Sequence, residues 1–228
     1  MTQRYYTPNL MEKSTLPLPD DEAKHAAVMR IQIGELIVCF DGMGHEVTAE
    51  IIAVNRREVI AMPTGDIRLV DRERKPEVHL AVALPKGDRQ KFLIEKAVEL
   101  GAARLTPILC QRSVVRPDAA AVQRMQRAVI EASKQCGRNQ LMVVDPPTEL
   151  ISLLEQTPES IVRYIADPSS GDRFVKPADR PYCVLIGPEG GFTIEEVAKA
   201  ESFRWTRIGL GPRILRIETA ALAILAME

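Results

Sequence analysis

Between position 78 and the end of the chain, apolar residues form short unbroken runs separated by longer stretches with helical spacing. Short buried runs bounded by turn residues are typical of strands in a parallel sheet, which is covered on both faces. The predicted strands are Val78–Leu84, Leu105–Leu109, Met142–Val144, Ile161–Ala166, Val184–Ile186 and Ile208–Leu210. The predicted helices are Asp88–Leu100, with Asp88 as its cap, Asp118–Cys136, Glu149–Gln156, one opened by Thr193 and one from Ile217 onward. This alternation predicts an α/β domain with a mostly parallel sheet.

The residues before Pro76 follow a different pattern, with short apolar runs separated by turn residues. Strands are predicted at Leu36–Phe40, Val47–Val54, Glu58–Met62 and Asp66–Val70, and residues 1–23 are predicted to form a partly extended arm. Several short strands with turns between them indicate a small β-barrel or sandwich. The sequence therefore predicts two domains, a β module at residues 1–73 and the α/β domain at 76–228.

Two of the predicted strands run directly into turns rich in glycine and proline. The first turn reads Gly187-Pro188-Glu189-Gly190-Gly191, and Thr193 and Glu196 then have the spacing of a capping box that opens a helix. The second turn covers Gly211–Arg216. Neither turn has the spacing of a Rossmann fingerprint or a P-loop. Turns without side chains at the carboxyl ends of parallel strands let the backbone contact a ligand, so two such turns on adjacent strands predict a pocket.

Composition and charge narrow the class of protein. Four cysteines are widely spaced without a CxxC pair, which fits reduced thiols in a cytoplasmic protein, and the three histidines all precede position 80, which argues against a metal site. The sequence predicts neither a signal peptide nor a membrane span. Residues 76–140 carry 11 basic and 6 acidic side chains, while the whole chain has a net charge of −1. This basic segment is either a phosphate-facing surface or a solvated helix face.

Segments from most of the chain together resemble a known family. They are GPEGGFTIEEV and LGPRILRIETAAL near the end of the chain, EASKQCGRN and KGDRQKFLIEKAVELGA upstream, and the N-terminal stretch His25–Ile51 with HAAVMRIQIGE and FDGMGHEVTAEI. They resemble the RsmE-type ribosomal RNA small subunit (uridine-N3) methyltransferases of the SPOUT superfamily. The resemblance implies a trefoil-knotted α/β domain, an N-terminal PUA-like RNA-binding barrel and a homodimer. It also implies methyl transfer from S-adenosylmethionine to N3 of a uridine in 16S ribosomal RNA, either as free RNA or in the assembled small subunit.

The same resemblance implies which residues form the site. The cofactor-binding set is Ile186, Gly187, Glu189, Gly190, Gly191, Leu210, Gly211, Ile214, Leu215, Thr219 and Ala220. The RNA-binding set, chosen from basic residues near the predicted strand ends, is Lys86, Arg89, Arg112, Arg116, Lys134, Arg138 and Arg213. Arg216 and Glu218 are the catalytic candidates. The Arg216 guanidinium can stabilise a deprotonated uracil ring, and the Glu218 carboxylate either positions an arginine or accepts the N3 proton. Each arginine taken singly fits a structural ion pair equally well.

Two other functions remain open from the residues alone. One is a SPOUT methyltransferase that acts on another RNA, such as tRNA, and the other is a non-catalytic RNA-binding relative. The chain also departs from the family at Ile217, where threonine is common, so no catalytic role is expected at that position.

Overall fold

The computed structural model describes residues 2–11, 14–55 and 58–227. It divides into two compact units, which are described separately. The first unit contains Met1–Glu73 together with Ile130–Leu141, and the second contains Arg74–Val129 and Met142–Glu228.

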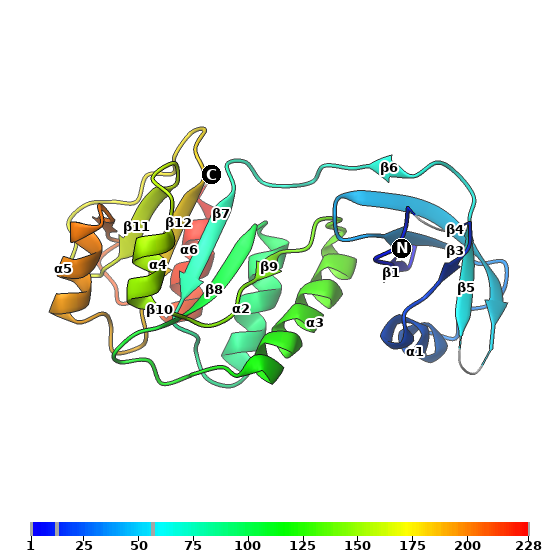
Figure 1. Ribbon diagram of the computed structural model, residues 1–228, viewed down its shortest axis with the longest axis horizontal. Helices are drawn as coiled ribbons and strands as arrows, with labels where there is room; N and C mark the ends of the chain where they lie inside the picture. Colours follow the sequence, from blue (N-terminus) through cyan, green and yellow to red (C-terminus); the bar gives the residue numbers. More distant parts are fainter. Residues whose placement is uncertain (1, 12–13, 56–57, 228) are drawn as a thin grey trace. The chain divides into compact units, whose positions relative to one another are not determined.

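The first unit is a small β structure that packs against helix α1 (Figure 1). Its elements are β1 (Arg4–Tyr6), β2 (Leu16–Pro17), α1 (Asp20–Val28), β3 (Leu36–Phe40), β4 (His45–Val54), β5 (Val59–Pro63) and β6 (Arg68–Leu69). The sheet order is β1-β3-β4-β5-β2, with β6 paired to β4. Apolar side chains from these strands and from α1 bury one another, and Tyr5, Ile37 and Ile51 are each at most 1% exposed. The predicted β module is therefore confirmed.

The prediction of a partly extended arm at residues 1–23 holds for two short strands, but these residues are part of the β structure and end in a helix. β1 pairs in parallel with β3, β2 pairs with β5, and α1 begins at Asp20. The helix was missed because its apolar residues are mostly alanines, which give a weak periodic signal. Three acidic residues in its first turn, Asp20, Asp21 and Glu22, suit the positive end of the helix dipole.

The second unit is a seven-stranded sheet with the order β10-β8-β7-β12-β11-β13, and with β9 paired to β8. All of its strand pairs are parallel. The strands are β7 (Val78–Val82), β8 (Arg104–Leu109), β9 (Val143–Val144), β10 (Thr148–Glu149), β11 (Val162–Ala166), β12 (Tyr182–Ile186) and β13 (Thr206–Ile208). The helices are α2 (Asp88–Glu99), α3 (Ala119–Cys136), α4 (Leu150–Gln156), α5 (Ile194–Ser202) and α6 (Ile217–Ala226). The part of α3 from Ile130 onward belongs to the first unit. The predicted α/β class is confirmed.

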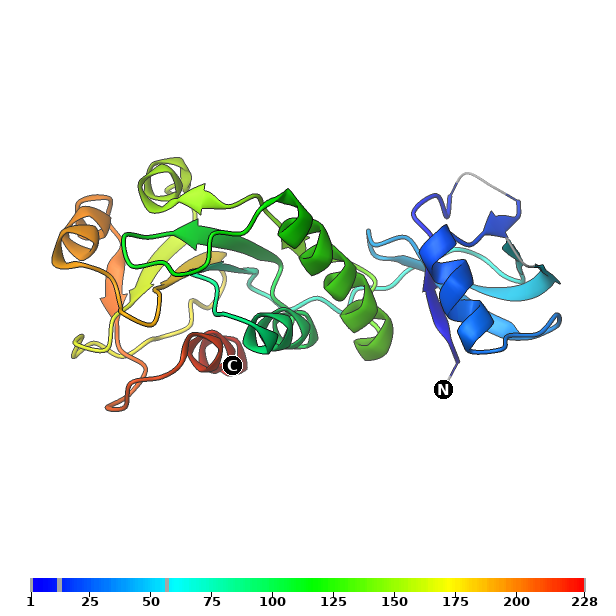
Figure 2. The ribbon, with the colours of Figure 1, turned by 90° about the horizontal axis from the view of Figure 1, so that it is seen from below.

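Helices cover both faces of this sheet. α2 and α6 lie together on one face, and α4 and α5 lie on the other (Figure 2). Side chains of β7 and β12 alternate between the two layers, so both strands consist mostly of apolar residues, with His79 of β7 as a polar exception. Ala81, Cys183 and Leu185 face the layer that contains Trp205 and the leucines of α4.

Some predicted details are corrected by the structure. β13 ends at Ile208 instead of beginning there, and β11 lies between β12 and β13, so the two strands that precede the turns are not neighbours. Asp88 is the first helical residue of α2, and Gly87 occupies the N-cap with φ +63°. By contrast, Asp118 accepts a hydrogen bond from the Ala121 N–H, as predicted for the start of α3.

Candidate functional site

A cavity of about 480 Å³ opens in the second unit at the carboxyl ends of β11, β12 and β13. Both glycine turns contribute to its wall, so the structure brings together the two segments that the sequence singled out. The wall is formed by Ala166, Asp167, Pro168, Ile186, Gly187, Pro188, Glu189, Gly190, Gly191, Phe192, Val197, Ile208, Leu210, Gly211, Arg213, Ile214, Leu215, Arg216, Ile217 and Ala220.

The first turn owes its shape to specific glycines. A Cβ atom at Gly187 would lie 3.0 Å from the ring of Phe192, and Gly191 has φ +69°, which side chains rarely adopt. The turn then leads into the predicted capping box, which is confirmed: the Thr193 hydroxyl accepts from the Glu196 N–H, and Glu196 accepts from the Thr193 N–H. Capping satisfies two of the unpaired N–H groups at the start of α5 and so fixes where the turn ends.

The second turn begins where the chain passes the loop that follows β11. Gly209 donates to the Asp172 carbonyl oxygen at 2.6 Å, and Phe174 donates to the Gly209 carbonyl oxygen. A Cβ atom at Gly209 would lie 2.7 Å from the Ser170 carbonyl oxygen, so a larger residue would push the two backbones apart. Gly211, with φ +104°, lets the turn reverse above the cavity.

Asp167 is a cavity residue that the sequence reasoning missed. Its side chain accepts from the backbone and hydroxyl of Ser169 and from Arg207. Burial opposes ionisation of the carboxyl, but the Ser169 hydrogen bonds and the Arg207 charge outweigh it and hold the pKa of Asp167 below its usual range. The DPSSGD segment that follows β11 has the residue types of a turn, and a turn at a strand end was the available signal.

Nearly all of the predicted cofactor-binding residues line the cavity. The exception is Thr219, which is exposed on α6 and does not belong to the wall. Ile214 is 87% exposed although it lines the cavity, so the structure does not place it in the core. An isoleucine in an apolar segment could equally have packed in the core, and the exposure of Ile214 excludes that alternative.

The two catalytic candidates have different surroundings. Arg216 is the N-cap residue of α6, exposed, and part of the cavity wall. Glu218 lies in the first turn of α6 with its side chain only 8% exposed, and it is not among the wall residues. Its nearest cation among the described residues is Arg89, whose Nη1 lies 3.8 Å from Oε2.

The basic residues predicted to bind RNA separate into three groups. Lys86, Arg116 and Arg213 are exposed, and Arg116 lies 3.6 Å from the carboxylate of Glu149. Arg89 and Arg112 contact the first glycine turn. Arg89 donates to the Glu189 carboxylate at 3.1 Å, and Arg112 donates to the Gly190 carbonyl oxygen at 2.7 Å.

Lys134 and Arg138, the third group, are buried in the first unit. Lys134 pairs with Glu22 at 3.0 Å, and Arg138 forms a two-pronged pair with Glu73. Their role in RNA binding stays a prediction, and burial against carboxylates favours a structural role.

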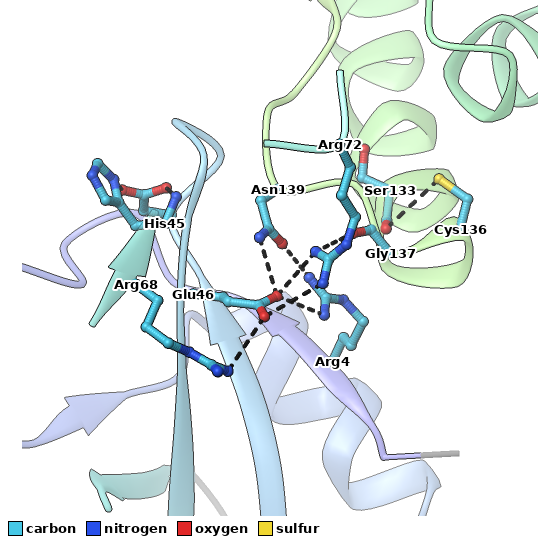
Figure 3. Close-up of polar contacts among 10 residues, drawn as sticks. Arg4, His45, Glu46, Arg68, Arg72, Ser133, Cys136, Gly137 and Asn139 are labelled. Carbon is cyan, nitrogen blue, oxygen red and sulfur yellow. Dashed lines mark hydrogen bonds and ion pairs between the residues drawn. The ribbon is translucent and has the colours of Figure 1, made fainter. Parts of the chain in front are cut away.

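Near these residues, one carboxylate collects several cations (Figure 3). Glu46 accepts from Arg4 at 3.1 Å, from Arg72 at 3.1 Å and from Asn139 at 3.0 Å, and Arg68 lies 3.7 Å away. Burial alone would raise the pKa of Glu46, but the hydrogen bonds from Arg72, Asn139 and Arg4 lower it to about 2. The partners are far apart in sequence, so no local motif predicts this cluster.

The described residues show neither a metal-binding group nor a membrane-spanning helix. Within residues 2–11, 14–55 and 58–227, no group of histidine, cysteine and acidic side chains is arranged to hold a metal ion. In the same described part of the chain, no helix combines the length and the apolar character needed to cross a membrane.

Comparisons with known proteins identify the family. Residues 72–227 match the RNA methyltransferase domain, and residues 18–61 match the RNA methyltransferase PUA domain. Ribosomal RNA small subunit methyltransferase E of Bacillus subtilis is 30% identical over 98% of this chain and 94% of its own length. The chain belongs to the ribosomal RNA small subunit methyltransferase E family. The resemblance drawn from the sequence motifs is thus confirmed.

Solved structures of similar proteins agree with the fold. The Neisseria gonorrhoeae enzyme bound to S-adenosyl methionine superimposes with a TM-score of 0.92 at 31% identity, covering 99% of this chain and 96% of that one. A Legionella pneumophila methyltransferase structure in complex with SAM gives a TM-score of 0.91 at 32% identity, with 99% and 96% of the two chains covered. The β module accordingly has the PUA-like fold of the family.

Proposed function

We propose that this protein transfers a methyl group from S-adenosylmethionine to N3 of a uridine in small-subunit ribosomal RNA. The observation that carries the proposal is the cavity built from both glycine turns, in a family whose Neisseria member is bound to S-adenosyl methionine. A volume of about 480 Å³ falls within the range of ligand pockets. Its wall offers bare backbone for an adenosine and carboxylates at Asp167 and Glu189 for a cationic donor.

In this proposal the methyl donor lies between the two glycine turns, and the residues of both turns that line the cavity bind it. The donor supplies an electrophilic methyl group. The residues of the chain then have to present a uridine whose N3 has lost its proton. Arg216 is suited to this task because its guanidinium stays charged and offers a planar fork of donors to a uracil carbonyl oxygen. Glu218 is assigned a positioning role, because its buried carboxylate lies outside the cavity wall.

The RNA is proposed to bind through the PUA-like module and through exposed cations near the cavity. Lys86, Arg112, Arg116 and Arg213 are the exposed members of the predicted RNA-binding set, and Arg112 already donates to the Gly190 carbonyl oxygen. Arg213 belongs to the cavity wall and would hold a phosphate beside the target base, which must leave its stack to reach the donor. The same proposal includes domains at residues 1–73 and 76–228, a trefoil knot in the second domain, a homodimer and a cytoplasmic location.

The test is methyl transfer from labelled donor to three substrates in parallel: purified small-subunit RNA, assembled small subunits and tRNA. Nucleoside mass spectrometry then identifies the product. The proposal predicts 3-methyluridine in small-subunit RNA, free or assembled. Labelled tRNA with unlabelled ribosomal RNA would replace the proposed substrate, and donor binding without transfer to any RNA would favour a non-catalytic relative.

A further inference from the structure

The guanidinium of Arg89 joins the two walls of the cavity from outside. It lies in the first turn of α2, donates to Glu189 of the first glycine turn, and reaches Glu218 at the start of α6, directly after the second turn. These three side chains are called the Arg89 bridge. We propose that Arg89 is a positioning residue that sets the distance between the two cavity walls and so controls binding of the methyl donor. This inference rests on the proposed function.

The burial of Glu218 is the first argument. Its Oε2 atom is buried and has no hydrogen-bond partner in the described part of the chain, and Arg89 supplies the ion pair at 3.8 Å. A buried carboxylate is costly unless a cation compensates it. Without Arg89 the start of α6 would have to move to bring the Glu218 carboxylate into contact with water. That movement would reach the second cavity wall through the adjoining Arg216 and Ile217.

The position of Arg89 on its helix is the second argument. A cation in the first turn of a helix faces the positive end of the dipole, where it is disfavoured. Arg89 therefore contributes little to the stability of α2 by its charge. The two carboxylates offset the unfavourable interaction of the Arg89 charge with the helix dipole. Both carboxylates come from segments next to the cavity.

A neighbouring contact supports the same role for the first turn. Arg112 extends from the loop after β8, donates to the Gly190 carbonyl oxygen, and packs so closely that a Cβ atom at Gly190 would lie 3.3 Å from its Cδ. In that loop the Gln111 N–H donates to Glu196 of the capping box at 2.8 Å. The first turn is therefore held by α2 and by the loop after β8, and Arg89 extends the connection to Glu218.

The test compares Arg89→Ala and Arg89→Lys with the unmodified protein by calorimetry, using S-adenosylmethionine as the titrated ligand. Lys96→Ala is a matched control, because Lys96 lies on the same helix with the same 37% side-chain exposure and pairs with Glu99. Arg89→Ala should weaken donor binding about tenfold or more. Arg89→Lys should recover part of the loss, since lysine keeps the charge but lacks the fork that spans two carboxylates. Lys96→Ala should bind the donor normally.

A double-mutant cycle separates positioning from general damage. Because Arg89 compensates the buried Glu218 charge, Arg89→Ala combined with Glu218→Gln should lose less affinity than the sum of the two single changes. Additive losses, or donor affinity within about twofold of the unmodified protein in Arg89→Ala, would overturn the inference. Weaker RNA binding with unchanged donor binding would instead make Arg89 an RNA contact. If the unmodified protein itself binds no donor, the proposed function fails before the bridge is tested.

Discussion

At the scale of single residues, the chemistry depends most on Arg216. The side chain is exposed at the N-cap of α6 and forms no capping hydrogen bond, so its removal should leave the fold intact. Arg216→Ala should lower kcat by about 10²- to 10³-fold, the usual cost of removing one group that stabilises developing negative charge. The dissociation constant for the donor should change by less than about threefold, since a role in the chemical step leaves donor binding intact. Steady-state kinetics and calorimetry measure the two quantities.

Arg213→Ala provides the contrast for that experiment. A phosphate contact at Arg213 should raise the KM for RNA and leave kcat at saturating RNA nearly unchanged. Equal losses of turnover and donor affinity in Arg216→Ala would instead make Arg216 a structural residue.

The sequence predicted single residues well where their partners are local. Thr193 and Glu196 are three positions apart, and their capping box needs no tertiary contact, so spacing alone identified it. Arg89 and Glu189 are 100 positions apart, and Arg138 and Glu73 are 65 apart. Basic residues in such pairs look like free cations in a sequence, which is why buried and exposed members entered one RNA-binding set.

At the scale of elements, the sheet contains a buried polar network that makes stability depend on pH. His79 on β7 lies 2.7 Å from the Thr106 hydroxyl on β8, and that hydroxyl bonds Asp145, which follows β9. Burial is the main cause that lowers the pKa of His79 to about 4; Asp145 opposes this shift, and Arg104 adds to it. The folded protein therefore holds His79 neutral at a pH where the unfolded chain already binds a proton.

The sign of the effect follows from that difference. Stability from neutral His79 is present above the unfolded pKa of about 6.5, and it is lost as pH falls towards 4, by at most about 3 kcal/mol. Urea denaturation at pH 7, 6 and 5 should show a falling free energy of unfolding. His79→Gln should be less sensitive across this window. An identical pH dependence in the variant would assign the effect to other groups.

The order of the strands could not be derived from their patterns. Runs of apolar residues identified most strands of the second unit, because a doubly covered sheet needs such runs. The same runs do not state which strand lies beside which. The position of β11 between β12 and β13 was therefore not predicted, and the two-residue β10 was too short to give a periodic signal. The glycine turns still meet, because the carboxyl ends of all three strands share one edge of the sheet.

At the scale of the whole molecule, the paired C-terminal motifs carried the identification. Periodicity gave the α/β class and a separate β module, and the motifs gave the family that the comparisons then confirmed. The weakest region was the first 23 residues, where alanine-rich helix and very short strands lack a periodic signal. Long-range polar contacts, such as those of Glu46 and Glu218, could not be predicted from sequence patterns, because their partners lie in distant segments of the chain.

The proposed function requires that the two glycine turns bind the methyl donor. Calorimetry of Gly190→Val with S-adenosylmethionine tests this most directly. A valine would displace the Arg112 side chain, which already lies 3.3 Å from the position of a Cβ atom, and would block the approach of a ligand to the backbone. Gly65→Val is the control, because a Cβ atom there meets nothing within 4 Å. The account predicts that donor binding falls below detection in Gly190→Val and is normal in Gly65→Val. Unchanged affinity in a folded Gly190→Val protein would contradict it.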